Sequence, residues 1–338
     1  MALYCGIDLH SNNSVISLID ETDRLVSEKR LDNNLELIEH HLRPFQDDIS
    51  GVVVESTYNW YWLVDGLIEQ GYPVPLANTL AIQQYNGLKY TNDETDARFL
   101  AHLLRLNILP TGYIYPKALR QVRDLLRRRL LLVKQHTAQL LSLQSLIGRH
   151  SGLRLSSHQV KQLNQDALAQ YLDAGVTLFA AQQTLQLMQQ LNAQIDVIEG
   201  YVLARCQDSK PYTLITTTPG IGTILGMTIL LETGPIERFA KVGNYASYAR
   251  CVPTDKISNG KSKGKGNAKN GNRYLAMAFV EAAHYAAIWD PTIKRYYQRK
   301  CKRKPVMVAK KTVANKLTRA CYHMLKDGTA SDVTRAFG

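Results

Sequence analysis

The chain has 338 residues, of which 45% are hydrophobic and 21% are charged, as in an ordinary soluble protein long enough for two or three domains. No uninterrupted apolar run reaches the roughly 18–20 residues that a membrane-spanning helix needs, and the N-terminus lacks the basic start of a signal peptide. The five cysteines are scattered and form no CxxC pair, which argues against a zinc site or a disulfide framework. We therefore expect a reduced, cytoplasmic protein that does not associate with a membrane.

The net charge of +12 is unevenly distributed along the chain. Residues 1–100 hold 16 acidic and 6 basic residues, whereas residues 241–320 hold 19 basic and 3 acidic residues. Such a concentration of positive charge predicts a polyanionic partner, above all nucleic acid. The alternative interpretation is a solvated surface that keeps the protein soluble.

The first hundred residues alternate between strand-like and helix-like segments. The predicted strands are residues 3–9, 14–20, 24–31, 51–57 and 72–78, and the predicted helices are residues 34–42, 58–71 and 93–106. Pro73 and Pro75 place the fifth strand at a sheet edge. A meander of three strands followed by crossovers is the order used by RNase H-like domains. We therefore expect a mixed α/β sheet in a first domain of residues 1–112.

Residues 113–207 have a different character. Residues 119–148 and 177–206 are rich in Gln and Leu and nearly free of Gly and Pro, with apolar residues at steps of three and four. This pattern predicts two long helices packed as an antiparallel, coiled-coil hairpin. Its expected role is spacing or self-association, and a grip on nucleic acid is the alternative.

The predicted third domain, residues 208–338, is mostly helical. The motif "TTPGIG" at residues 217–222 lies between two apolar segments and resembles the turn of a helix-hairpin-helix module. In such a turn Gly220 and Gly222 would let backbone N–H groups approach a phosphate. A plain helix–turn–helix packing corner is the alternative. A helix over residues 274–288 and a basic helical region over 291–326 are expected after it.

Four acidic residues fall at the ends of predicted elements. Asp8 is at the end of the first strand, and Glu55 is at the end of the fourth. Asp93 and Asp96 are three residues apart at the start of the last helix of the first domain, and therefore on one face. Glu94 is left out because it is rotated by about 100° from Asp93. With the first and fourth strands adjacent in the sheet, the four carboxylates would converge.

A cluster of like charges needs a cation, and carboxylate oxygens suit Mg²⁺ or Mn²⁺. Two such ions are the machinery of metal-assisted phosphoryl transfer. Taken singly, each acid has a plainer interpretation, because Asp93 and Asp96 could serve a helix N-terminus and Asp8 could begin a turn. The four together predict a metal site.

Residues 255–272 form a basic segment that cannot build a core. Its lysines would neutralise a nucleic-acid backbone, and its glycines predict a mobile loop that approaches a phosphate closely. The candidate nucleic-acid contacts are Lys256, Lys261, Lys263, Lys265, Lys269 and the adjoining Arg273. A disordered, non-specific basic linker is the alternative.

Five motifs together resemble the insertion sequence 110 family of transposases, also called Piv-like or DEDD recombinases, over nearly the whole chain. They are "GIDLH" with Asp8, "VVVEST" with Glu55, "NDETDARFLA" with Asp93 and Asp96, "TTPGIG", and "CVPTDKISNGKSKGKG" with Ser258. This sequence departs from the usual pattern of the family at Tyr58, at residues 249–252 and at residues 10–12.

The resemblance implies a RuvC-like domain that holds Mg²⁺ on the four acids, a coiled-coil insertion, and a second domain whose nucleophilic serine corresponds to Ser258. The serine would form a covalent bond to a DNA phosphate, and strands of donor and target DNA would be exchanged without free double-strand breaks. A structured guide RNA encoded by the element, and a homo-oligomer (a dimer or tetramer) that assembles the site from two subunits, are also implied. Ser262 is the nearest other hydroxyl.

Two other functions compete with this interpretation. One is a metal-dependent, structure-specific nuclease, such as a Holliday-junction resolvase, that uses water instead of serine. The other is a nucleic-acid-binding scaffold whose acids no longer hold metal. Only the recombinase would leave DNA covalently attached to the protein.

Overall fold

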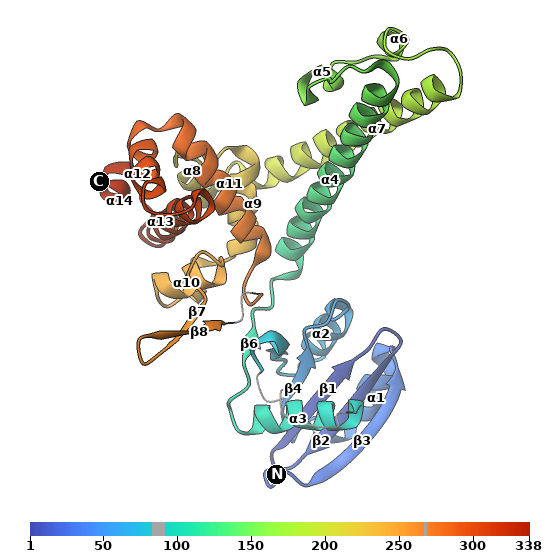
Figure 1. Ribbon diagram of the computed structural model, residues 1–338. Helices are drawn as coiled ribbons and strands as arrows, with labels where there is room; N and C mark the ends of the chain where they lie inside the picture. The colour runs from blue at the N-terminus through green and yellow to red at the C-terminus, as the bar shows by residue number, and fades with distance from the viewer. Residues whose placement is uncertain (83–91, 267–268) are drawn as a thin grey trace. The chain divides into compact units, whose positions relative to one another are not determined.

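The structure is a computed structural model that describes residues 1–82, 92–266 and 269–338 (Figure 1). In the two strands after residue 254, the structure describes the backbone but not the side chains of four residues. These are Lys256, Ile257, Ser262 and Lys265. The chain forms two compact units, residues 1–117 (unit 1) and residues 118–338 (unit 2), and each is described by itself.

Unit 1 is built on a six-stranded mixed sheet with the strand order β3-β2-β1-β4-β5-β6. The strands are β1 (Leu3–Leu9), β2 (Asn13–Ile19), β3 (Leu25–Asp32), β4 (Ile49–Glu55), β5 (Leu76–Ala77) and β6 (Thr111–Gly112). β1 pairs with β2 in the antiparallel sense and with β4 in the parallel sense. Both β1 and β4 are buried on both faces, which explains their nearly continuous apolar sequences.

Helices cover both faces of this sheet. α1 (Leu35–Leu42) and α2 (Tyr61–Glu69) pack against Ile7 and Val54 in one apolar cluster. α3 (Asp93–Arg105) packs against Val53 on the opposite face. The mixed α/β architecture expected for the first domain is confirmed, as is the predicted adjacency of the first and fourth strands.

The fifth predicted strand is shorter than expected, and its edge position was wrong. Only Leu76–Ala77 pairs as a strand, because Pro73 and Pro75 have no N–H to donate. Their carbonyl oxygens still accept hydrogen bonds from Val52 and Val54 of β4, at 2.9 and 3.3 Å. β6 then pairs with β5 on its outer side, so that β6 is the edge strand. Two residues were too few to be recognised in the sequence.

Unit 2 begins with the two long helices, α4 (Lys117–Ser151) and α7 (Val176–Cys206). Leu143 near the end of α4 packs with Leu185 near the start of α7. Leu126 near the start of α4 packs with Val202 near the end of α7. The helices are therefore antiparallel, as predicted. The short helices α5 (Ser157–Lys161) and α6 (Gln165–Leu168) lie in the connection between them.

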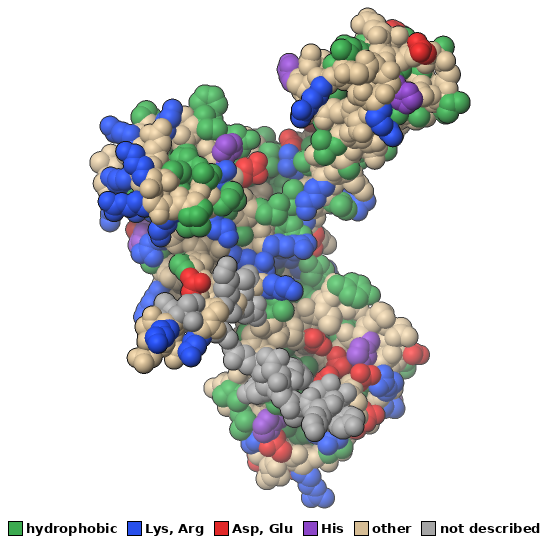
Figure 2. Space-filling view, viewed as in Figure 1, with side chains coloured by type: hydrophobic (Ala, Val, Ile, Leu, Met, Phe, Trp, Pro, Cys, Tyr) green, Lys and Arg blue, Asp and Glu red, His purple; other side chains and the backbone are tan. Residues whose placement is uncertain are grey.

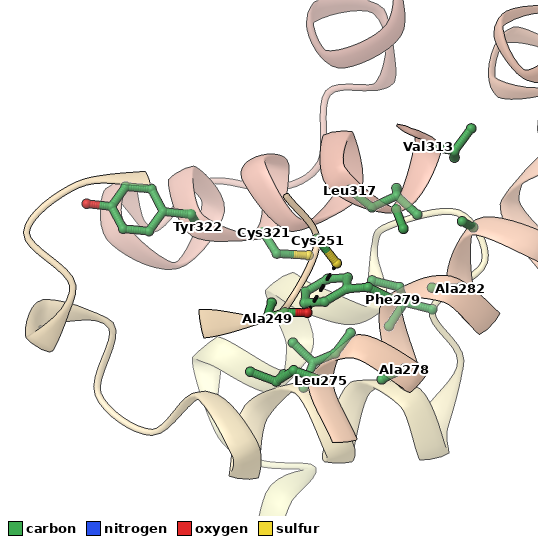
Figure 3. Close-up of a cluster of buried hydrophobic side chains, with 14 of the residues drawn as sticks. Ala249, Cys251, Leu275, Ala278, Phe279, Ala282, Val313, Leu317, Cys321 and Tyr322 are labelled. Carbon is green, nitrogen blue, oxygen red and sulfur yellow. Dashed lines mark hydrogen bonds between the residues drawn. The ribbon is translucent and has the colours of Figure 1, made fainter. Parts of the chain in front are cut away.

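The rest of unit 2 is mostly helical. Its helices are α8 (Lys210–Thr216), α9 (Thr223–Thr233), α10 (Val242–Tyr248), α11 (Arg273–Trp289), α12 (Pro291–Cys301), α13 (Val306–Asp327) and α14 (Val333–Phe337). Figure 3 shows the apolar cluster between α11 and α13, where Phe279 and Leu275 face Leu317 and Cys321. The thiol of Cys251 is buried there and donates to the carbonyl oxygen of Ala249, at 3.3 Å.

The segment predicted as a mobile loop is instead a two-stranded antiparallel hairpin, β7 (Asp255–Ser258) and β8 (Lys261–Lys265). Asn259 and Gly260 form its turn with φ angles of 48° and 71°. A two-residue hairpin turn of type I′ requires positive φ at both central positions, and Asn-Gly is the favoured pair. The expectation of a free backbone was therefore wrong, because the turn signal outweighs the glycine-rich composition.

Across the three described stretches of the chain, no helix combines the length and the apolarity that crossing a membrane requires.

Candidate active site

Asp8 and Glu55 are brought side by side by the pairing of β1 with β4. Ile7 is the parallel partner of Val54, so the next residue on each strand, Asp8 and Glu55, lies at the same end of the sheet. Asp8 is 5% exposed, although its side chain is ionisable. The pairing that the sequence predicted therefore places the buried side chain of Asp8 beside the partly buried side chain of Glu55.

Asp96 reaches this end of the sheet because α3 crosses β1 at Gly6. A Cβ atom on Gly6 would lie 1.9 Å from the carbonyl oxygen of Ala97 and 2.8 Å from the amide nitrogen of Ala101. The helix backbone thus rests directly on the strand backbone, which only glycine permits. Since Asp96 immediately precedes Ala97, this contact sets its distance from Asp8.

The first turn of α3 is fixed by a capping box. The side chain of Asn92 accepts from the backbone N–H of Thr95 at 2.8 Å, and the hydroxyl of Thr95 accepts from the backbone N–H of Asn92 at 3.0 Å. This cap holds Asp93 and Asp96 on the helix start. The plainer interpretation, in which those acids cap the helix themselves, is not needed, because Asn92 does so.

The carboxyl groups influence one another strongly. Burial, a hydrogen bond with Asp8 and the charges of Asp8 and Asp96 together raise the pKa of Glu55 from 4.5 to about 7. Burial, followed by the charges of Asp8 and Asp93, also raises the pKa of Asp96. These shifts mark a place where negative charge is crowded and incompletely neutralised.

Asp93 lies on the more exposed side of the group and has a cation of its own. Arg30 donates to its Oδ2 at 2.8 Å, and this hydrogen bond is the main reason that the pKa of Asp93 is lowered. The four predicted acids therefore lie close enough to influence one another, and Asp93 is the member that is partly neutralised by an arginine, Arg30.

His10 adds a residue that the sequence analysis did not include in the site. Its Nε2 lies 3.3 Å from Oδ2 of Asp8 and 3.2 Å from Oδ2 of Asp93. One ligand atom from each of these three residues lies within 4.8 Å of the others, which suits a shared metal ion. Nε2 is shielded from solvent and has no hydrogen bond of acceptable geometry among the described residues. Nε2 therefore lies at ion-pair distance from two carboxylates without a well-aligned hydrogen bond to either, an arrangement that also fits ligands around one cation.

Ser258 is the last residue of β7 before the turn, and Lys261 is directly opposite it across the hairpin. Both residues are exposed. Side chains opposite each other in an antiparallel pair are close, with Cβ atoms about 4.5–5.5 Å apart. The serine predicted as the nucleophile is thus presented at a hairpin tip with a lysine as its cross-strand neighbour. Ser262 is at the next register position, opposite Ile257.

The other predicted nucleic-acid contacts lie in or after the hairpin. Lys263 and Lys269 are exposed, and the side chains of Lys256 and Lys265 lie outside the described part of the chain. Arg273 opens α11, where its guanidinium donates to the hydroxyl of Tyr274 at 2.9 Å.

Arg250 fixes the segment that follows the hairpin. Its guanidinium donates to the carbonyl oxygens of Lys269 and Gly271, the latter at 2.6 Å. Arg250 itself has a φ of 54°, which strains any residue with a Cβ. The hydrogen bonds of its side chain offset that strain. This gives a physical reason for one departure that the sequence analysis noted at residues 249–252.

The two glycines of the "TTPGIG" turn have different surroundings. Gly220 has a φ of 84°, and a Cβ there would lie 2.4 Å from both Ala282 O and Ala286 N of α11. Close packing against α11 therefore requires this glycine. Gly222 is the N-cap residue of α9, and a Cβ there would meet nothing within 4 Å. The proposed phosphate contact fits the open side of Gly222 better than that of Gly220.

An exposed basic surface lies on and after α12, beyond the residues selected from the sequence (Figure 2). Its exposed members are Lys294, Arg295, Arg299, Lys302, Arg303 and Lys304. The signal was present in the sequence as the run "KRYYQRKCKRK", but helical spacing spreads it over several faces. The structure shows which of these side chains reach solvent.

A polar network within unit 2 holds the start of α11, the helix that follows the hairpin in the chain. Glu232 is 1% exposed and accepts from Arg127 of α4 at 2.6 and 2.7 Å. It also accepts from the side chain of Asn272 at 2.7 Å. Asn272 in turn caps α11 by accepting from the backbone of Tyr274 and Leu275. Arg127, Glu232 and Asn272 (the buried network) therefore connect α4, α9 and the start of α11.

Two transposase domains are recognised in the chain by comparison with known families. A transposase domain of the DEDD type found in IS110 elements matches residues 5–151, and the transposase IS116/IS110/IS902 family domain matches residues 212–298. The first contains Asp8, Glu55, Asp93 and Asp96, and the second contains Ser258.

A curated relative agrees with these matches. The insertion element IS110 uncharacterized 43.6 kDa protein of Streptomyces coelicolor is 31% identical over 140 residues, which are 41% of this chain and 35% of that protein. The matched part therefore spans about a third of the length of the relative. Because both recognised domains belong to the same family and together match more than half of the chain, the protein is a member of the IS110 family of transposases.

Proposed function

We propose that the protein cuts and exchanges DNA strands of an insertion sequence, with Ser258 as the nucleophile and a divalent metal ion on Asp8, Glu55, Asp93 and Asp96. The observation that carries this proposal is the convergence of four carboxyl groups from three separate elements, with the pKa of Glu55 raised to about 7. Buried, crowded carboxylates are destabilising on their own and become favourable around a cation.

The proposed metal is Mg²⁺ or Mn²⁺, held by the four acids in a domain of RNase H-like, RuvC-like fold. When bound, such an ion polarises a phosphate and stabilises the charge that develops on its oxygens. The carboxyl groups of Asp8 and Glu55 are held by adjacent strands and need little rearrangement to serve as ligands. Asp96 is held at the same place by the contact of α3 with Gly6.

In the proposed step, the hydroxyl oxygen of Ser258 attacks a DNA phosphorus. The bond between that oxygen and phosphorus forms, the bond from phosphorus to the leaving sugar oxygen breaks, and the serine proton is released as the leaving oxygen gains one. A serine hydroxyl needs activation for this role. Lys261, opposite Ser258 in the hairpin, supplies positive charge beside the phosphate.

Donor DNA, target DNA and a structured guide RNA are the proposed partners, and a homo-oligomer is the proposed assembly. Support comes from the exposed basic surface on and after α12 and from a groove beside the "TTPGIG" turn. The groove is lined by residues that include Arg127 and the exposed side chains of Tyr285 and Trp289 on α11. Aromatic faces of this kind stack on unpaired bases.

The test is to incubate the full-length protein with labelled supercoiled DNA and Mg²⁺, denature the mixture, and look for DNA attached to protein. We expect a covalent adduct with the wild type and none with Ser258→Ala, while binding to DNA is unchanged. Ser262→Ala is the matched control, four residues away in the same hairpin, and keeps the adduct.

Peptide mapping of the trapped adduct identifies the residue that carries the phosphate. A label on any residue other than Ser258, or strand exchange by Ser258→Ala, would contradict the proposed nucleophile. Cut DNA without an adduct in the wild type would favour the water-using nuclease, and an absence of both products would favour a binding scaffold.

A further inference from the structure

We propose that His10 is an additional ligand of the divalent cation, and that its imidazole makes the site favour a transition-metal ion such as Mn²⁺ over Mg²⁺. The proposal rests on the metal site of the proposed function, and it adds to that site a neutral nitrogen ligand. Its basis is the place of His10 Nε2 between two of the acids.

The first argument is geometric. Nε2 lies 3.3 Å from an oxygen of Asp8 and 3.2 Å from an oxygen of Asp93, and the three atoms would surround a single ion after small shifts. The ring is partly exposed, whereas Nε2 itself is shielded from solvent and lacks a well-formed hydrogen bond. Its two carboxylate neighbours are close but poorly aligned for hydrogen bonds, and ligation of a shared ion would use all three atoms.

The second argument concerns how His10 is held. Its carbonyl oxygen accepts from the side-chain amides of Asn33 at 3.0 Å and Asn59 at 2.9 Å. The amide oxygens of those residues are engaged in turn, by the hydroxyls of Ser14 at 2.7 Å and Thr57 at 3.0 Å. Supporting contacts of this kind orient metal ligands in proteins. They connect the segment after β1 with the segments after β3 and β4.

The third argument concerns charge and ligand type. A neutral imidazole adds a ligand without adding negative charge to a site that already holds four carboxyl groups. Mg²⁺ prefers oxygen ligands, whereas transition-metal ions accept imidazole nitrogen. A site of carboxylates with one imidazole therefore shifts its preference away from Mg²⁺.

The experiment measures metal binding directly, with full-length protein and no DNA. Mn²⁺ is titrated into the protein, and the free ion is followed by electron paramagnetic resonance. Bound Mn²⁺ is examined by electron spin echo modulation for coupling to a nitrogen nucleus, and Mg²⁺ is then added to displace it. We expect nitrogen coupling in the wild type.

For His10→Ala we expect at least about tenfold weaker Mn²⁺ binding, loss of the nitrogen coupling, and a smaller change in Mg²⁺ binding. His10→Gln, which offers an amide oxygen of similar reach, keeps Mg²⁺ binding and also loses the coupling. His40→Ala is the matched control, because His40 is an exposed histidine on α1 of the same unit. Thermal unfolding in EDTA checks that each variant is folded.

The outcomes separate this proposal from the one on which it rests. Unchanged Mn²⁺ binding by Asp8→Asn would contradict the metal site itself. If Asp8→Asn loses Mn²⁺ while His10→Ala retains both the affinity and the nitrogen coupling, the four-acid site stands and the role of His10 is wrong. Equal losses of Mn²⁺ and Mg²⁺ affinity in His10→Ala would overturn the proposed preference.

Discussion

The acids of unit 1 and the serine of unit 2 are supported in different ways. Asp8, Glu55 and Asp96 come from elements whose backbones pair or touch, and the contact at Gly6 leaves no room for one extra carbon atom. Ser258 instead stands at the tip of a two-stranded hairpin, where it is exposed and its neighbours are mostly polar. The comparison teaches that the positions of the proposed metal ligands depend on packing between elements, whereas the position of the serine depends on the turn of its hairpin.

The largest expected effect comes from Gly6→Ala, which disrupts the packing of α3 on β1 that positions the acids. The added methyl group would overlap the carbonyl oxygen of Ala97, so α3 has to move away from β1 and take Asp96 with it. Overpacking costs about 1–3 kcal/mol or more when backbone must shift. We expect a clear drop in the melting temperature of unit 1 and loss of DNA cleavage.

Gly200→Ala is the control for that change, because Gly200 lies inside α7 and a Cβ there would meet nothing within 4 Å. Alanine is the better helix former by about 0.5–1 kcal/mol, so this variant should be slightly more stable. A Gly6→Ala protein that melts and cleaves like the wild type would refute the close contact.

A second change tests whether the hairpin that carries Ser258 contacts the DNA backbone. Replacing Lys261, Lys263 and Lys265 together by Gln removes three positive charges and leaves the buried cores intact. If each lysine displaces one condensed counterion, the slope of log affinity against log salt should flatten by up to about three. DNA binding measured between 50 and 200 mM salt gives this slope.

The matched variant for the hairpin replaces Lys294, Arg299 and Arg303 by Gln, which removes three exposed charges on and after α12. A slope altered only by this second variant would assign backbone contact to the helices and exclude it for the hairpin. The two salt slopes can be compared if both variants melt at the same temperature as the wild type, because all three proteins are then equally folded.

The smallest expected effect is a change of stability with pH that arises from the raised pKa of Glu55. The pKa of Glu55 is about 7 in the folded protein against 4.5 ordinarily, so the folded state retains a proton that the unfolded state has released between those values. The stability of the metal-free protein should therefore fall as pH rises from about 4.5 to 7. Glu55→Gln removes the part of that fall that comes from Glu55, and the raised pKa of Asp96 leaves a smaller one.

At pH 8 in EDTA we expect Glu55→Gln to melt about 2–4 °C above the wild type, the shift that roughly 1 kcal/mol produces in a domain. Partial solvent exposure keeps the effect below the full value of the pKa shift. At pH 4 the two proteins should melt together. Addition of Mg²⁺ at pH 8 should stabilise the wild type more than the variant, and a pH-independent difference would argue against this account of Glu55.

The features that the sequence predicted are those with a repeated or local signal. Short runs of apolar, β-prone residues located β1 and β4, and the ends of these runs located Asp8 and Glu55. The placement of Asp93 and Asp96 on one face followed from their spacing of three at the start of a predicted helix. Each of these depends on the order of residues along one element, which is why sequence reasoning could reach it.

The features that it missed depend on contacts between elements or on competing local signals. His10 joins the site only because two asparagines from other segments hold its backbone, and one histidine after a strand has no distinctive pattern. The role of Gly6 depends on the path of α3. The hairpin was misread as a loop because glycine-rich composition was given more weight than the turn signal of Asn259 and Gly260.

The buried network of Arg127, Glu232 and Asn272 has a consequence for the order in which unit 2 can assemble. Until α4 has docked, Glu232 lacks the two hydrogen bonds that it accepts from Arg127, and burying its carboxylate is then less favourable. The cap that Asn272 provides for α11, immediately after the serine hairpin, is then unsupported on one side. Docking of the long helical hairpin is thus a prerequisite for completing the segment that presents Ser258. A chain whose acidic unit folds first would therefore present Ser258, the proposed nucleophile, in its final setting only after α4 has packed against the rest of unit 2.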